Sequence, residues 1–132
     1  MKKYFYLKLM IFFVLMGLTA ISQLKAQDVF RKVSEMPEYS GGQTAMNQFI
    51  TQYITWPKTS DGAVKEGTVY VTFIVEKDGT LSQIKALKSI GESFEKEAEN
   101  VVKKMPKWTP GKNEGQTVRV MVSLPIEFKM KK

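Results

Sequence analysis

The chain contains neither cysteine nor histidine among its 132 residues. Without cysteine it can form no disulfide, no thiolate metal site and no cysteine-linked lipid anchor. Without histidine it lacks the usual general base at neutral pH and the commonest metal ligand. Catalytic sites that need either residue are therefore excluded, as is histidine-bound zinc. The acidic residues fall mainly at predicted turns and on one helix face, so we expect no enzymatic activity, no metal and no cofactor.

Acidic residues are also missing from residues 1–26, which hold four of the 20 basic residues of the chain. The formal net charge of +7 therefore overstates how basic the remainder is. Residues 27–132 carry the other 16 basic side chains against all 13 acidic ones. A mixed surface of this kind does not indicate a nucleic acid as the partner.

One long apolar run, Leu9–Ile21, follows the basic pair Lys2 and Lys3. A helix of that length spans about 20 Å at ~1.5 Å per residue, and the hydrocarbon core of a membrane is about 30 Å thick. The pattern is typical of a signal peptide, and we expect cleavage between Ala26 and Gln27. The alternative is a retained membrane anchor. In both cases the basic end stays in the cytoplasm and residues 27–132 are placed outside it.

Two stretches show the spacing of an amphipathic helix. In the first, Ser40 and Gln43 resemble a capping box, and apolar residues recur on one face until Pro57 ends the pattern. In the second, apolar residues recur over 94–105, and Pro106 stops the helix. The apolar residues of the first stretch are Ala45, Met46, Phe49, Ile50, Tyr53 and Ile54.

Three other stretches alternate between apolar and polar residues and are predicted strands. Asp78-Gly79 separates the first two, and this dipeptide between alternating runs is a strong hairpin signal. Pro125 lies in the last stretch, and proline has no N–H to donate to a sheet. We therefore expect the last strand to lie at an edge. The three stretches are residues 68–76, 81–88 and 116–128.

The order helix, strand, strand, helix, strand indicates an α+β fold. We expect a three-stranded antiparallel sheet with both helices packed on one face. The chain divides into a signal peptide over residues 1–26, a lead-in segment over 27–40 and one folded domain over 41–132.

Several short motifs follow one another in an order and spacing that resemble the TonB C-terminal domain family, over about residues 33–130. The resemblance implies a periplasmic domain that grips a short extended peptide of an outer-membrane receptor by adding it beside the last strand. It also implies a link to TonB-dependent uptake of siderophores or other nutrients. The motifs are Trp56-Pro57, Gly67-x-Val69-x-Val71-x-Phe73-x-Val75, Asp78-Gly79 and Met105-Pro106-Lys107-Trp108-x-Pro110-Gly111.

The predicted edge strand and the resemblance together suggest five partner-binding residues. Arg119, Met121 and Ser123 share the outward face of the last strand, whose backbone groups are unpaired if it lies at an edge. The resemblance implies that Trp56 and Pro57 border the peptide groove. Both groups also have a structural interpretation. In it, the three strand residues form a solvated sheet face, and Trp56 and Pro57 end a helix.

Transducers of this family carry a histidine in the membrane anchor and a long proline-rich spacer, and this chain has neither. Direct coupling to an inner-membrane proton motor is therefore not favoured. A free periplasmic binding module is the first hypothesis. The alternatives are a membrane-anchored transducer or accessory subunit that retains residues 1–26, a small periplasmic inhibitor or structural partner, and a homodimer formed by strand exchange.

Overall fold

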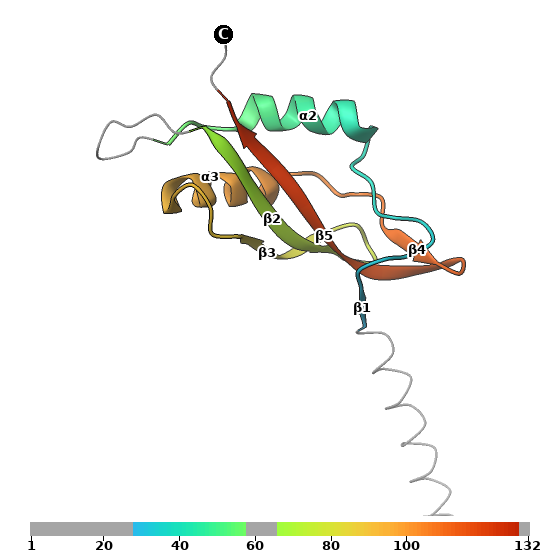
Figure 1. Ribbon diagram of the computed structural model, residues 1–132. Helices are drawn as coiled ribbons and strands as arrows, with labels where there is room; N and C mark the ends of the chain where they lie inside the picture. Colours follow the sequence, from blue (N-terminus) through green and yellow to red (C-terminus); the bar gives the residue numbers. More distant parts are fainter. Residues whose placement is uncertain (1–27, 58–65, 130–132) are drawn as a thin grey trace, which may run out of the picture.

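The computed structural model describes residues 28–57 and 66–129. The predicted signal segment and its cleavage site, Ala26 and Gln27, lie outside these ranges. Among the described helices, none combines the length and the apolar character needed to cross a membrane. In chain order the elements (Figure 1) are β1 (Val29–Phe30), α2 (Gly42–Tyr53), β2 (Gly67–Val75), β3 (Leu81–Ala86), α3 (Glu92–Lys103), β4 (Gly111–Asn113) and β5 (Gln116–Phe128).

The sheet is mixed and has five strands, which corrects the predicted three-stranded antiparallel sheet. Its order is β1-β5-β2-β3, and β4 pairs with the start of β5. The three predicted strands correspond to β2, β3 and β5, and both pairings of β2 are antiparallel. The two additions are β1, which pairs parallel with β5, and β4. With two and three residues, these strands are too short to show an alternating pattern in the sequence.

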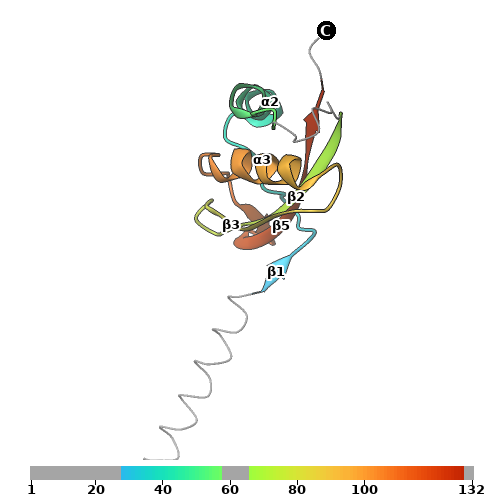
Figure 2. The same ribbon diagram turned by 90° about the vertical axis from the view of Figure 1, so that its left-hand side faces the viewer.

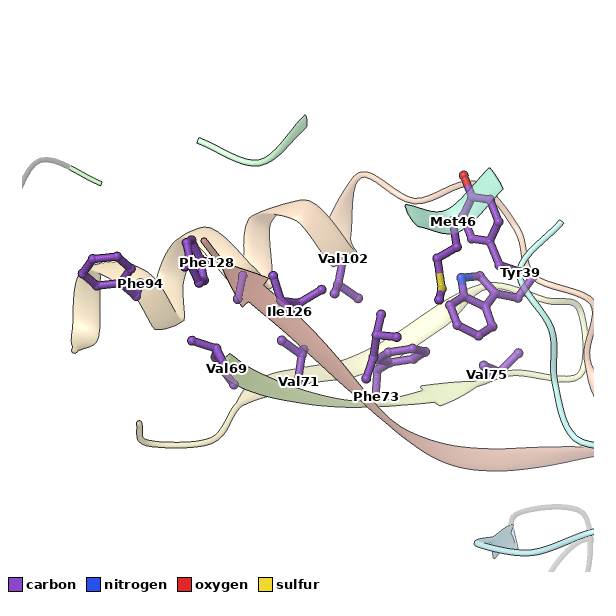
Figure 3. Close-up of a cluster of buried hydrophobic side chains, with 14 residues drawn as sticks. Tyr39, Met46, Val69, Val71, Phe73, Val75, Phe94, Val102, Ile126 and Phe128 are labelled. Atoms are coloured by element: carbon purple, nitrogen blue, oxygen red, sulfur yellow. The ribbon is translucent and has the colours of Figure 1, made fainter. Parts of the chain in front are cut away.

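The longest pairing joins β2 to β5, from Gly67 opposite Phe128 to Val75 opposite Val120. Because opposed residues share a face, this register places the alternating apolar residues from Val69 to Val75 and from Val120 to Phe128 on the side of the helices. Both helices lie on that same face of the sheet (Figure 2). The core between the layers is continuous from Phe94 to Tyr39 (Figure 3). The side chains of Val69, Val71, Phe73, Val75, Val120 and Ile126 have no exposed surface.

The turn between β2 and β3 packs against the segment that follows α3, residues 104–110, which we call the connector. Gly79 has a φ of +86°, and a Cβ at this position would overlap the carbonyl oxygen of Trp108. The Trp108 N–H donates to the Gly79 carbonyl at 2.9 Å, and the buried indole meets the Phe73 ring edge-on. Only glycine can combine this φ with so close a contact. The Asp-Gly turn therefore closes the hairpin and also positions the tryptophan.

The segment between β1 and α2 packs against the connector and β4. Glu35 and Lys112 exchange backbone hydrogen bonds of 2.9 Å in both directions, and Glu38 and Thr109 do the same at 3.1 and 2.8 Å. The Tyr39 ring is buried and contacts the Trp108 ring, with centroids 5.9 Å apart. This lead-in segment is thereby held on the same hydrophobic core as the helices and sheet.

The two faces of β5 should differ sharply in their tolerance of charge. Val120→Asp places a carboxylate where the native side chain has no exposed surface, at a cost of several kcal/mol against a total stability of about 5–15 kcal/mol. Ser123→Asp introduces the same group on the exposed face of the strand and should leave stability nearly unchanged. Circular-dichroism melts of the two variants provide the test. Equal melting temperatures would show that the assignment of the faces is wrong.

Candidate functional site: an unpaired strand edge and its groove

The register of the sheet determines which backbone groups of β5 face outward. The Tyr70 carbonyl accepts a 2.8 Å hydrogen bond from the Leu87 N–H, so the backbone of Tyr70 faces β3. Tyr70 lies opposite Pro125 in the pairing of β2 with β5. Because hydrogen-bonding direction alternates along antiparallel strands, Pro125 and the residues two positions before and after it direct their backbone groups away from β2.

Pro125 therefore removes no hydrogen bond from the ladder with β2, because its missing N–H would face the outer edge. On that edge, β1 pairs only with Arg119 and Val120. From Met121 to Phe128, no other described strand pairs with the outer edge of β5. Ser123 and Glu127 direct their N–H and carbonyl groups toward this edge. The prediction that the last strand presents an edge is correct for this half of β5, although β1 covers the start.

A groove of about 730 Å³ runs along this edge and has α2 as its other wall. In Figures 1 and 2, α2 lies beside the C-terminal half of β5. We call this feature the edge groove. It is lined by Gln43, Met46, Asn47, Ile50, Thr51 and Ile54 of α2 and the residue following it, and by Ser123, Leu124, Pro125, Glu127 and Lys129.

A second hollow, of about 300 Å³, continues from one end of the edge groove. The two share Gln43, Met46 and Leu124. Its remaining lining consists of Pro37, Glu38, Tyr39, Gly42, Trp108 and Val122. The unpaired edge is therefore accompanied by two adjoining hollows, which are lined by both apolar and polar side chains.

The start of α2 differs from the predicted capping box. The Ser40 hydroxyl donates to the Lys107 carbonyl at 2.7 Å and does not cap the helix. Gly41 is the N-cap residue, and no side chain bonds to the helix start. Gln43 is consequently available to the groove, where its Nε2 donates to Asn47 Oδ1 at 3.2 Å.

Of the five predicted partner-binding residues, only Ser123 lines the edge groove. Met121 lies opposite Ile74 on the face away from the helices and is half-buried. Trp56 and Pro57 are also half-buried. The Trp56 ring meets Phe94 and Phe128 edge-on, with centroids 6.1 and 5.9 Å apart, so it completes the core at the far end of β5.

Arg119 forms an ion pair within the sheet. Its Nε and Nη2 donate to the two carboxylate oxygens of Glu76 at 2.7 and 3.0 Å, and both side chains are less than a quarter exposed. The Ser82 hydroxyl also donates to Glu76. The hydrogen bond from Arg119 lowers the pKa of the Glu76 carboxyl, and the hydrogen bond from Ser82 has a smaller effect in the same direction. Burial opposes both by raising the pKa. This contact connects β5 to the end of β2 and the start of β3.

Sequence reasoning missed most of the groove, because it assigned Gln43 to a cap and Ile50 and Ile54 to the core. The two isoleucines are half-buried and do pack on the core, but they also line the groove. One signal was present in the sequence. Residues 39–57 contain no acidic or basic side chain, although a quarter of the chain is charged. A surface helix ordinarily carries charge on its outer face, so this absence marks α2 as unusual.

The ion pair should make stability depend on pH in the acidic range. Since folding lowers the pKa of Glu76 below its ordinary 4.5, the stabilisation is present above that value and is lost as the pH falls through the lowered value. Glu76→Gln should therefore cost about 1–3 kcal/mol at neutral pH and progressively less below 4.5. Urea unfolding across this range measures the difference in the free energy of unfolding between the variant and the native protein.

Glu127→Gln, in the exposed pair with Lys129, is the control and should have little effect on this free energy. A cost for Glu76→Gln that does not change with pH would contradict this assignment.

Within the described residues, no group of three or more acidic, histidine or cysteine side chains could hold a metal ion.

The comparisons with known proteins point to one family. The family described as Gram-negative bacterial TonB protein C-terminal matches residues 52–130. Neither the search of curated proteins nor the search of solved structures gave a match. Domains of this family interact with outer-membrane receptors in TonB-dependent transport and lie in the periplasm. Because the match covers more than half of the chain and includes β2, β3, α3, β4 and β5, the chain belongs to the TonB C-terminal family.

Proposed function

We propose that this chain is a periplasmic binding module that grips an extended peptide of an outer-membrane receptor by strand addition. The observation that carries the proposal is the outer edge of β5 beyond Val120, unpaired within the described residues and bordered by the edge groove. An added strand would bond to the outward backbone groups of Ser123 and Glu127. Strand addition beside an exposed sheet edge is an established way of recognising peptides.

The dimensions of the edge suit a short segment. Residues 121–128 extend over about 25 Å at ~3.3 Å per residue. Pro125 supplies a carbonyl but no N–H, so the ladder on this side has a gap in its donors. Main-chain bonds would provide most of the affinity, so the side chains of the peptide should matter only moderately and binding should be weak, about micromolar.

A homodimer formed by strand exchange is the second candidate, because the same unpaired edge can pair with that of another copy. The two proposals differ in concentration dependence. A receptor peptide should bind to a monomer, whereas self-pairing should increase with protein concentration and be displaced by peptide.

Ser123→Pro is the most direct test of strand addition. The outward N–H of Ser123 is lost, but the ladder with β2 is kept, as it is at Pro125. Isotope-labelled protein is titrated with synthetic peptides matching the periplasmic segments of outer-membrane receptors from the same cell. In the native protein, shifts should concentrate along residues 121–128 and α2. Ser123→Pro should weaken binding about tenfold, an effect the size of one net hydrogen bond.

Ser123→Ala is the matched control, because it removes the hydroxyl and keeps the N–H. It should bind like the native protein. If all three proteins bind equally, or if shifts appear only away from β5 and α2, strand addition at this edge is wrong. A thermal melt of each variant separates a lost donor from a lost fold.

We also propose that residues 1–26 are a signal peptide removed between Ala26 and Gln27, which leaves the lead-in segment 27–40 and the domain 41–132 in the periplasm. The proposal rests on the short apolar run and its basic flank. The mass of the chain recovered from the periplasm should correspond to residues 27–132. A mass that includes residues 1–26, recovered with the membrane fraction, would instead support the anchored transducer or accessory subunit.

A further inference from the structure

We infer that α2 makes the edge groove selective for an uncharged segment, in which Gln43 and Asn47 hydrogen-bond to the docked strand and Ile50 and Ile54 take an apolar side chain. This inference rests on the proposed strand addition and names the chemistry of its ligand. It concerns a part of the chain that the family comparison does not explain. The match begins at residue 52, so nearly all of α2 lies outside it.

The two walls of the edge groove differ in the groups that they present to a peptide. The edge of β5 offers backbone groups, which bind any peptide alike. The wall formed by α2 offers side chains, which can distinguish one peptide from another. Its groove-lining polar residues are Gln43, Asn47 and Thr51, four residues apart and so on one side of the helix.

The wall formed by α2 is uncharged. No side chain over residues 39–57 is acidic or basic. The charged side chains that line the edge groove are Glu127 and Lys129, and they pair with each other at 3.1 Å. A charged peptide residue placed against α2 would lose hydration and find no opposite charge. An uncharged segment pays no such cost.

The polar side chains of the α2 wall keep hydrogen-bonding groups for a ligand. Gln43 and Asn47 both line the edge groove, so both side chains can contact a strand docked there. Their mutual bond uses Gln43 Nε2 and Asn47 Oδ1. Gln43 Oε1 and Asn47 Nδ2 supply an acceptor and a donor, so the pair can bind peptide N–H, carbonyl or amide groups.

Part of the edge groove is lined by apolar side chains. Ile50 and Ile54 are half-buried and line the groove together with Leu124 and Pro125. An apolar side chain of the peptide that points toward α2 here would be removed from water. The expected ligand is thus an extended, uncharged segment with hydrogen-bonding side chains beside Gln43 and Asn47 and an apolar side chain beside Ile50 and Ile54.

The test uses the protein purified from the envelope of cells that express the full 132-residue chain. A phage-displayed library of random nine-residue peptides is selected against it, and the enriched peptides are synthesised with a fluorescent label. Anisotropy titrations then compare the native protein with two groove variants, Asn47→Asp and Gln43→Glu. The controls are Gln48→Glu and Gln52→Glu. They introduce the same charge at exposed positions of α2 that do not line the edge groove.

We expect the enriched peptides to be poor in acidic and basic residues. Each groove variant should weaken their binding about tenfold, and each control less than about twofold. If the peptides bind along β5 but the groove variants match the controls, α2 is not a selective wall and strand addition still stands. The same conclusion follows if charged peptides dominate the selection. If the native protein enriches no peptide that shifts residues 121–128, both this inference and the proposed function are wrong.

Discussion

The antiparallel ladder between β2 and β5 is the constraint on which the rest of the structure depends. It places the alternating apolar residues of both strands, from Val69 to Val75 and from Val120 to Phe128, against the helices and leaves the other edge of β5 facing away from β2. β5 has 13 residues and β2 has nine, so β5 extends beyond its main partner. β4 pairs with that extension, β1 pairs with Arg119 and Val120 where the extension meets the ladder, and the C-terminal part of β5 keeps an outer edge to which no described strand is paired.

Around this ladder, other contacts serve to hold β5 in position. Glu76 and Arg119 connect it to the end of β2, where the two strands part. Trp108 joins the β2–β3 turn to the connector and lies within contact of Tyr39, which begins the approach to α2. The position of α2 beside the edge is thus determined by the same buried aromatic cluster that closes the hairpin. The shape of the edge groove and the packing of the core are therefore physically linked.

Much of the fold could be predicted from the sequence, because long elements show their period. The strand ending at Phe128 and the hairpin at Asp78-Gly79 are both confirmed. Short strands escaped prediction, and so did the Gly79–Trp108 contact, which joins residues far apart in the chain. The groove escaped because a residue such as Ile50 can face core and groove at once, and periodicity cannot separate the two. The ion pair of Arg119 with Glu76 was missed because it depends on the register of the strands.

Backbone amide hydrogen exchange along β5 measures the central claim most directly. In the monomeric protein, the amides of Ser123 and Glu127 should exchange quickly, and those of Leu124 and Ile126, which face β2, should exchange slowly. Saturation with a bound receptor peptide should protect Ser123 and Glu127 and leave the other two unchanged. If Ser123 and Glu127 are already as protected as Leu124 in the monomer, or stay unprotected when peptide is bound, the outer edge of β5 is not the site where a strand is added.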